Sequence, residues 1–135
     1  MQVLEGRGWR LLVDPARQPF PVLIGGAAWA AELTWAEVRE LRHLAGELER
    51  QLAALADRLL AEEAISMALE RPLGPGSLWM ELEGHRHCWS LRFVLTPATG
   101  ARALEAGWDG AASAAISAAL QGLVLPPPAA ESHWP

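Results

Sequence analysis

The most restrictive feature of the sequence is one stretch in which the hydrophobic period changes. Between residues 34 and 61 apolar side chains recur at alternating spacings of three and four, the pattern of an amphipathic helix. They are Val38, Leu41, Ala45, Leu48, Leu52, Leu55 and Leu59. On both sides of this stretch apolar and polar residues alternate, which indicates half-buried β-strands. A chain with one long helix between strand-rich segments is predicted to be an α+β protein.

The start of the helix is marked by Thr34, a good N-cap residue, with Glu37 three positions later, where it can complete a capping box. The period predicts that the helix continues to about Ala61. Its apolar seam has two interpretations that the sequence leaves open. The seam packs on the domain's own sheet, or it pairs with a copy of itself in another subunit.

The remaining elements are predicted from alternation and turn residues. Strands are expected at residues 8–13, 21–24 and 28–33 before the helix, and at 65–69, 78–83, 89–95 and 102–108 after it. Tight connections between the later strands indicate an antiparallel sheet. A second helix is expected over 111–121, capped by Asp109 or Ser113 and ended by Gly122. Each half therefore reads as strands followed by a helix, which suggests an internal structural duplication.

Length and composition indicate one domain that is not dedicated to duplex nucleic acid. The 135 residues suit a single α+β domain over 1–122, followed by a Pro-rich tail, 123–135, that we expect to be disordered. The net charge is −5, and every basic residue is Arg. Dedicated nucleic-acid binders usually carry a basic excess, because much of their affinity comes from neutralising phosphates. A local Arg patch remains compatible with this overall charge.

The single cysteine, Cys88, cannot form an internal disulfide. The first ten residues lack the apolar run of a signal peptide, and the longest uncharged stretch, 110–130, is rich in small residues and ends in prolines. We therefore expect a cytoplasmic protein without membrane association.

Six short stretches carry a family resemblance by their identity and order. They are Gly8-Trp9-Arg10, Leu23-Ile24-Gly25-Gly26, Trp29-Ala30-Ala31-Glu32-Leu33-Thr34, Ala61-Glu62-Glu63, Leu78-Trp79-Met80-Glu81-Leu82-Glu83-Gly84 and Trp89-Ser90-Leu91-Arg92-Phe93. Together they resemble the small cyanobacterial family DUF1818, a domain of unknown function, over residues 6–122.

This resemblance implies a fold similar to the Whirly proteins and the transcriptional coactivator positive cofactor four. Those proteins bind single-stranded DNA and repeat a unit of four antiparallel strands and a helix. Whirly proteins carry a Lys-rich strand motif on the binding face, whereas this chain has no Lys. No DNA-binding residue of theirs can be transferred, and a shared fold does not by itself imply a shared function.

The content of seven Trp residues is unusually high for a chain of this length. Aromatic faces can stack on unpaired bases, and Arg residues lie near several of these Trp residues. The candidate binding surface consists of Trp9, Arg10, Trp79, Trp89, Arg92 and Arg102. Core packing, a protein interface and base stacking each account for such a Trp content.

The sequence also contains weaker candidates for catalytic or metal-binding residues. Glu81 and Glu83 share one strand face, and His85, His87 and Cys88 cluster around a turn. They would need to converge in a pocket, and the spacing matches no zinc motif. We assign no catalytic or metal-binding residue, and we infer no cofactor and no small-molecule ligand.

The sequence does not identify the function. It favours a non-catalytic protein-interaction or scaffolding domain, with a protein partner or self-association to an oligomer. The alternative, single-stranded nucleic-acid binding, requires Arg residues gathered on one sheet face.

Overall fold

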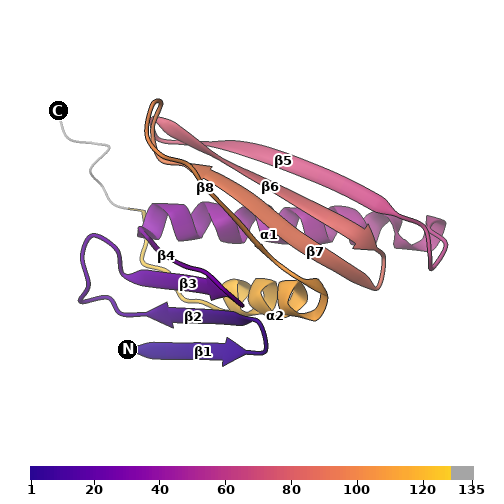
Figure 1. The fold of residues 1–135 in the computed structure, drawn as a ribbon, viewed down its shortest axis with the longest axis horizontal. Helices are drawn as coiled ribbons and strands as arrows, with labels where there is room; N and C mark the ends of the chain where they lie inside the picture. The colour runs from indigo at the N-terminus through magenta and orange to yellow at the C-terminus, as the bar shows by residue number, and fades with distance from the viewer. Residues whose placement is uncertain (129–135) are drawn as a thin grey trace.

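The computed structural model describes residues 1–128 and contains two four-stranded antiparallel sheets and two α-helices (Figure 1). The first sheet consists of β1 (Gln2–Gly6), β2 (Trp9–Val13), β3 (Val22–Gly26) and β4 (Ala30–Leu33), in that order. The second consists of β5 (Ile65–Leu73), β6 (Gly76–His85), β7 (Cys88–Thr96) and β8 (Leu104–Trp108). Helix α1 (Trp35–Leu55) follows the first sheet and α2 (Gly110–Gln121) follows the second. The predicted α+β class, with two strands-then-helix units, is confirmed.

Strand β1 is the one strand that the hydrophobic pattern does not predict. It pairs antiparallel with β2 at the edge of the first sheet and completes the four strands. Only Leu4 is partly buried, and the other four residues of the strand are exposed. An edge strand with one partly buried side chain has no alternation to detect, so the prediction began at residue 8.

The first helix begins as predicted. The Thr34 hydroxyl accepts a hydrogen bond from the Glu37 amide at 3.2 Å, and the Glu37 carboxylate accepts one from the Thr34 amide at 2.8 Å. The first five seam residues are buried within this chain: Val38, Leu41, Ala45, Leu48 and Leu52. Packing on the domain's own sheet therefore accounts for most of the seam.

The end of α1 differs from the prediction of about Ala61. The α-helix stops at Leu55, which is 40% exposed, and a short 3₁₀ turn, η1 (Ala56–Arg58), follows. Arg86, in the turn between β6 and β7, donates hydrogen bonds to the carbonyls of Ala56 and Leu59, at 3.1 and 2.9 Å. These bonds hold both sides of the 3₁₀ turn against Arg86. A contact from a residue 30 positions away cannot be read from local periodicity.

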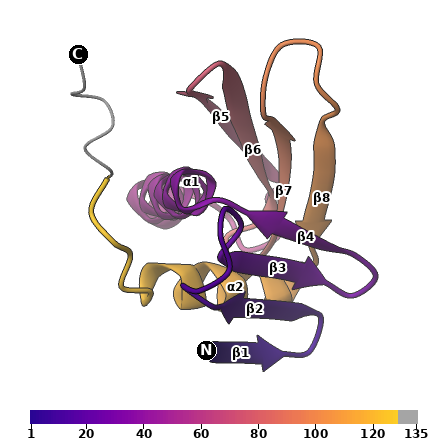
Figure 2. The ribbon, with the colours of Figure 1, turned by 90° about the vertical axis from the view of Figure 1, so that its left-hand side faces the viewer.

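Each helix contacts the sheet of the other half, and α2 also packs on its own sheet. Helix α1 contacts β5 and β6 of the second sheet, and α2 contacts β7 of the second sheet and β2 of the first. Figure 2 views α1 nearly end-on, beside the second sheet. Each strands-then-helix unit therefore depends on the other to cover its apolar surface.

Three aromatic side chains join the sheets. The indole N–H of Trp108 donates to the Gly25 carbonyl at 2.9 Å, and the indole N–H of Trp29 donates to the Gly107 carbonyl at 3.0 Å. Phe93 lies against both rings, with centroid distances of 5.5 Å to Trp108 and 5.9 Å to Trp29. We name these three side chains the aromatic junction.

Close packing at the aromatic junction explains a glycine at the end of strand β3. Gly26 is the last residue of the strand, and its amide donates to the Trp29 carbonyl at 2.9 Å across the turn to β4. A Cβ atom at Gly26 would collide with the indole of Trp29. Glycine at this position therefore allows the close approach of the indole to the strand.

The segment after α2 is held against α1. Leu123 is buried, and its carbonyl accepts a hydrogen bond from Arg42 at 2.8 Å. The Pro126 carbonyl accepts one from Arg39 at 2.6 Å. The sequence analysis assigned residues from 123 onward to the tail. Its described beginning contacts the domain, and residues 129–135, with Trp134, lie outside the described residues.

Among the elements of residues 1–128, neither helix combines the length and apolar character that crossing a bilayer requires.

Replacing Trp108 by Phe tests the aromatic junction. The change removes the indole donor from the buried Gly25 carbonyl, so we expect a loss of about 1–2 kcal/mol in the free energy of unfolding. Urea titration followed by circular dichroism measures it. The matched control is Trp79→Phe, at a half-buried indole outside the junction, with an expected loss below about 0.5 kcal/mol. Equal losses for the two variants would contradict the role of the junction.

Candidate interaction surface

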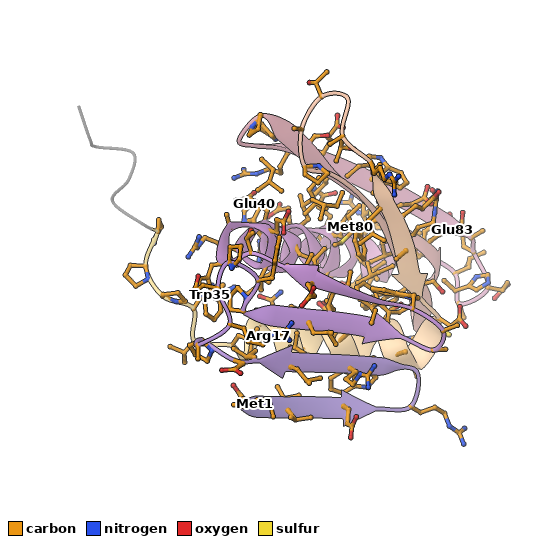
Figure 3. The ribbon with its side chains drawn as sticks, turned by 60° about the vertical axis from the view of Figure 1, so that its left-hand side comes forward. Met1, Arg17, Trp35, Glu40, Met80 and Glu83 are labelled. Atoms are coloured by element: carbon orange, nitrogen blue, oxygen red, sulfur yellow. The ribbon has the colours of Figure 1, made fainter. Side chains whose placement is uncertain are left out.

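The second sheet has one face packed on the helices and one face turned away from them. Leu78, Met80 and Leu82 of β6 are buried, as are Leu91, Phe93 and Leu95 of β7. Figure 3 labels Met80, which points to the interior, and Glu83, which points outward. The outer face consists of Ser66, Ala68, Glu70, Trp79, Glu81, Glu83, Ser90, Arg92, Val94, Glu105 and Gly107. Strict alternation along the strands produces this division.

Arg92 occupies the centre of the outer face. Its guanidinium carbon lies 4.8 Å from the centre of the Trp79 ring, within the range of a cation–π contact. It forms an ion pair with Glu81 at 3.0 Å and a second one with Glu105. The hydrogen bonds to Glu81 and then to Glu105 raise the pKa of the guanidinium. Arg92 is therefore engaged by two carboxylates and one indole of its own chain.

The charge on this face is predominantly negative. Glu70, Glu81, Glu83 and Glu105 contribute four carboxylates against the single guanidinium of Arg92, which leaves a net formal charge of −3. Within residues 1–128, neither Glu70 nor Glu83 forms an ion pair. These two carboxylates are free to meet an external cation.

Strand register gives the outer face an ordered row. Glu70 pairs with Trp79, Trp79 with Val94, and Val94 with Glu105, so these four residues cross the sheet from β5 to β8. We name them the acid-capped row. Its middle is an indole and an aliphatic side chain, and a carboxylate stands at each end.

The predicted binding residues do not gather on one face. Trp79 and Arg92 lie together on the outer face, whereas Trp89 shares the inner face with Leu91 and packs against the core. Arg102 is exposed in the connection before β8. Of the six candidate residues, the outer face of the second sheet therefore carries Trp79 and Arg92.

The other two predicted residues belong to the first sheet. Trp9, on β2, packs against the core, and its indole lies against Gly6 of the neighbouring strand. Arg10 is exposed on the opposite face of the same strand, where its register partners are Glu5 and Gly25. Strand alternation already puts Trp9 on the face of Leu11 and Trp89 on the face of Leu91, and both of those leucines are buried.

The carboxylates of the outer face were only partly anticipated. The sequence analysis paired Glu81 with Glu83 on one strand face, as the structure has them. It did not include Glu70 and Glu105, which lie 35 residues apart in sequence and meet the same row only through strand pairing. The strand register of the second sheet was the information needed to identify them.

The turn candidates His85 and Cys88 pair across the β6–β7 turn. His85 contacts the Glu63 carbonyl through its Nδ1 at 3.2 Å, and the Cys88 thiol is exposed. No three His, Cys, Asp or Glu side chains in the described part of the chain are arranged to hold a metal ion. One hollow of about 770 Å³ lies between Met1, Trp35 and residues 124–127, and its lining contains no ionisable side chain.

Comparisons with known proteins give a family and a solved relative. Residues 4–123 match the model of a family described as a domain of unknown function, DUF1818. A similar crystal structure is that of a protein of unknown function from the DUF155 family of Prochlorococcus sp. NATL2A, with a TM-score of 0.80 and 33% sequence identity. The match covers 90% of this chain and 97% of that one. No curated protein matches.

Replacing Arg92 by Met tests the geometry at the centre of the outer face. Removal of the guanidinium takes the cation from the Trp79 ring, so we expect the Trp79 indole resonance to shift in a ¹H–¹⁵N spectrum, with Trp29 and Trp108 unchanged. The Trp79→Phe variant assigns the resonance. Arg10→Met, on the first sheet, is the control and should leave it in place. A spectrum in which all indole resonances move would contradict a local contact.

Proposed function

The chain belongs to the DUF1818 family, and we propose that it is a non-catalytic protein-interaction domain whose contact surface is the outer face of the second sheet. The observation that carries the proposal is the acid-capped row, in which Trp79 and Val94 are each half-buried and stand between carboxylates. Protein interfaces commonly combine an aromatic or aliphatic centre with a polar rim.

The role of the remaining Trp residues supports this assignment. Trp108 is buried, and Trp9, Trp29, Trp35 and Trp89 pack against the core. Among the described Trp residues, Trp79 is the one that the register puts on the outer face. A contact surface built on it uses an indole that is not needed to fill the core.

Single-stranded nucleic-acid binding, the alternative that the resemblance implies, has less support. The two sheets with their helices are compatible with a Whirly-like arrangement, but fold alone carries no function. The outer face has a net formal charge of −3, which opposes phosphates. Arg10 is on the other sheet, and Arg92 is paired with two carboxylates.

We place the domain in the cytoplasm. The exposed, unpaired thiol of Cys88 suits a reducing compartment, in which thiols persist.

A photo-crosslinking residue at Ala68 tests the proposed surface. Ala68 is exposed in the middle of β5 on the outer face, and Ala118, exposed on α2, is the matched control. We expect a discrete crosslinked protein adduct from Ala68 in native cells and none from Ala118. Adducts from Ala118 alone would show that the contact surface lies elsewhere than on this sheet and would contradict the proposal.

Titration with mixed-sequence single-stranded DNA separates the two functions. We expect no saturable quenching of Trp fluorescence at low or physiological salt, because the outer face repels phosphates. Saturable quenching that weakens with salt would make nucleic-acid binding the leading function.

A further inference from the structure

The acid-capped row has the dimensions of a short extended peptide. Glu70 and Glu105 stand on the two edge strands of a four-stranded sheet, three strand spacings apart, which corresponds to about 14 Å. An extended chain advances about 3.3 Å per residue, so four residues also cover about 13–14 Å. Side chains at positions i, i+2 and i+4 of such a chain point to one side.

We propose that the partner of this face is an extended segment with basic side chains at positions i and i+4 and an apolar side chain at i+2. This inference rests on the proposed function and names the chemistry of the partner. The segment crosses the strands along the acid-capped row. Its basic side chains meet Glu70 and Glu105, and its apolar side chain meets Trp79 and Val94.

Charge complementarity selects a basic partner over an anionic one. The net formal charge of −3 repels phosphate groups and acidic peptides. The Glu70 carboxylate has no ion-pair partner among residues 1–128, so a cation can pair with it without displacing an internal contact. At the other end, Glu105 is exposed and shares its carboxylate with Arg92. The Glu70 end is therefore the stronger determinant.

The spacing also distinguishes a peptide from a metal ion. Oxygen ligands lie roughly 2.3–2.6 Å from a calcium ion, and they lie closer still to a magnesium ion. Carboxylates on opposite edges of a four-stranded sheet cannot share one such ion. They can share a chain that carries two separate cations.

Amide and indole chemical shifts of the purified chain measure binding of synthetic peptides. The first peptide has nine residues, with arginine at its third and seventh positions, leucine at its fifth and serine elsewhere. The second has the same composition with the two arginines adjacent, and the third replaces both arginines by glutamate. We expect the first peptide to shift the Trp79 indole saturably and to bind less tightly as salt is raised. The adjacent-arginine peptide should bind more weakly, and the glutamate peptide should give no shift.

Variants of the chain locate the contact. Glu70→Gln should weaken binding of the first peptide about two- to fivefold, the usual effect of one exposed ion pair. Glu5→Gln removes the same charge from an exposed position on the first sheet and should have no effect. Glu70→Lys should weaken binding further, and a peptide with glutamate in place of the arginine that meets residue 70 should restore it.

The results separate this inference from the proposed function. Equal weakening by Glu70→Gln and Glu5→Gln, or equal binding of the two arginine peptides, overturns the inference, because only net charge would then matter. Absence of peptide binding with retained crosslinking at Ala68 also overturns it and leaves the proposed function standing. Absence of both overturns the proposed function as well.

Discussion

The structure depends on the reciprocal hydrogen bonds of the aromatic junction. Trp29, from the connection before β4, donates to the carbonyl of Gly107 on β8, and Trp108, at the end of β8, donates to the carbonyl of Gly25 on β3. Each indole thus satisfies a carbonyl of the opposite sheet, and Phe93 packs against both rings. Because Trp108 directly precedes the N-cap of α2, the same contact fixes where that helix starts. With both helices committed to the interior of this arrangement, the outer face of the second sheet is left without a cover.

Much of the fold follows from local patterns, and the exceptions have long-range causes. The period of α1, its capping box and the alternation of β6 and β7 are properties of neighbouring residues, so the sequence alone predicts them. The end of α1 is not local, because Arg86 reaches it from a distant turn. Strand β1 was missed because an edge strand with mainly exposed residues carries no signal. For the site, Trp79 and Arg92 were both among the candidate residues, but the row that ends in Glu70 and Glu105 exists only after four strands have been placed in register.

The Arg residues illustrate why counting charges says little about a surface. Arg39, Arg42 and Arg86 donate to backbone carbonyls at the ends of other elements. Arg71 pairs with Glu40 of α1, and Arg92 pairs with two carboxylates. The planar guanidinium suits such fixed, multiple hydrogen bonds better than an ammonium group does, which gives a physical role to the absence of Lys. The basic groups thus serve largely as internal connectors, and the outward charge is set by glutamates.

The contacts of each helix with the sheet of the other half have a consequence for how the chain folds. Helix α1 follows the first sheet but covers β5 and β6, and α2 packs on β7 of its own sheet and also reaches β2. Neither half alone buries all of its apolar surface, so the two halves form one cooperative folding unit, and partial unfolding of one exposes the core of the other.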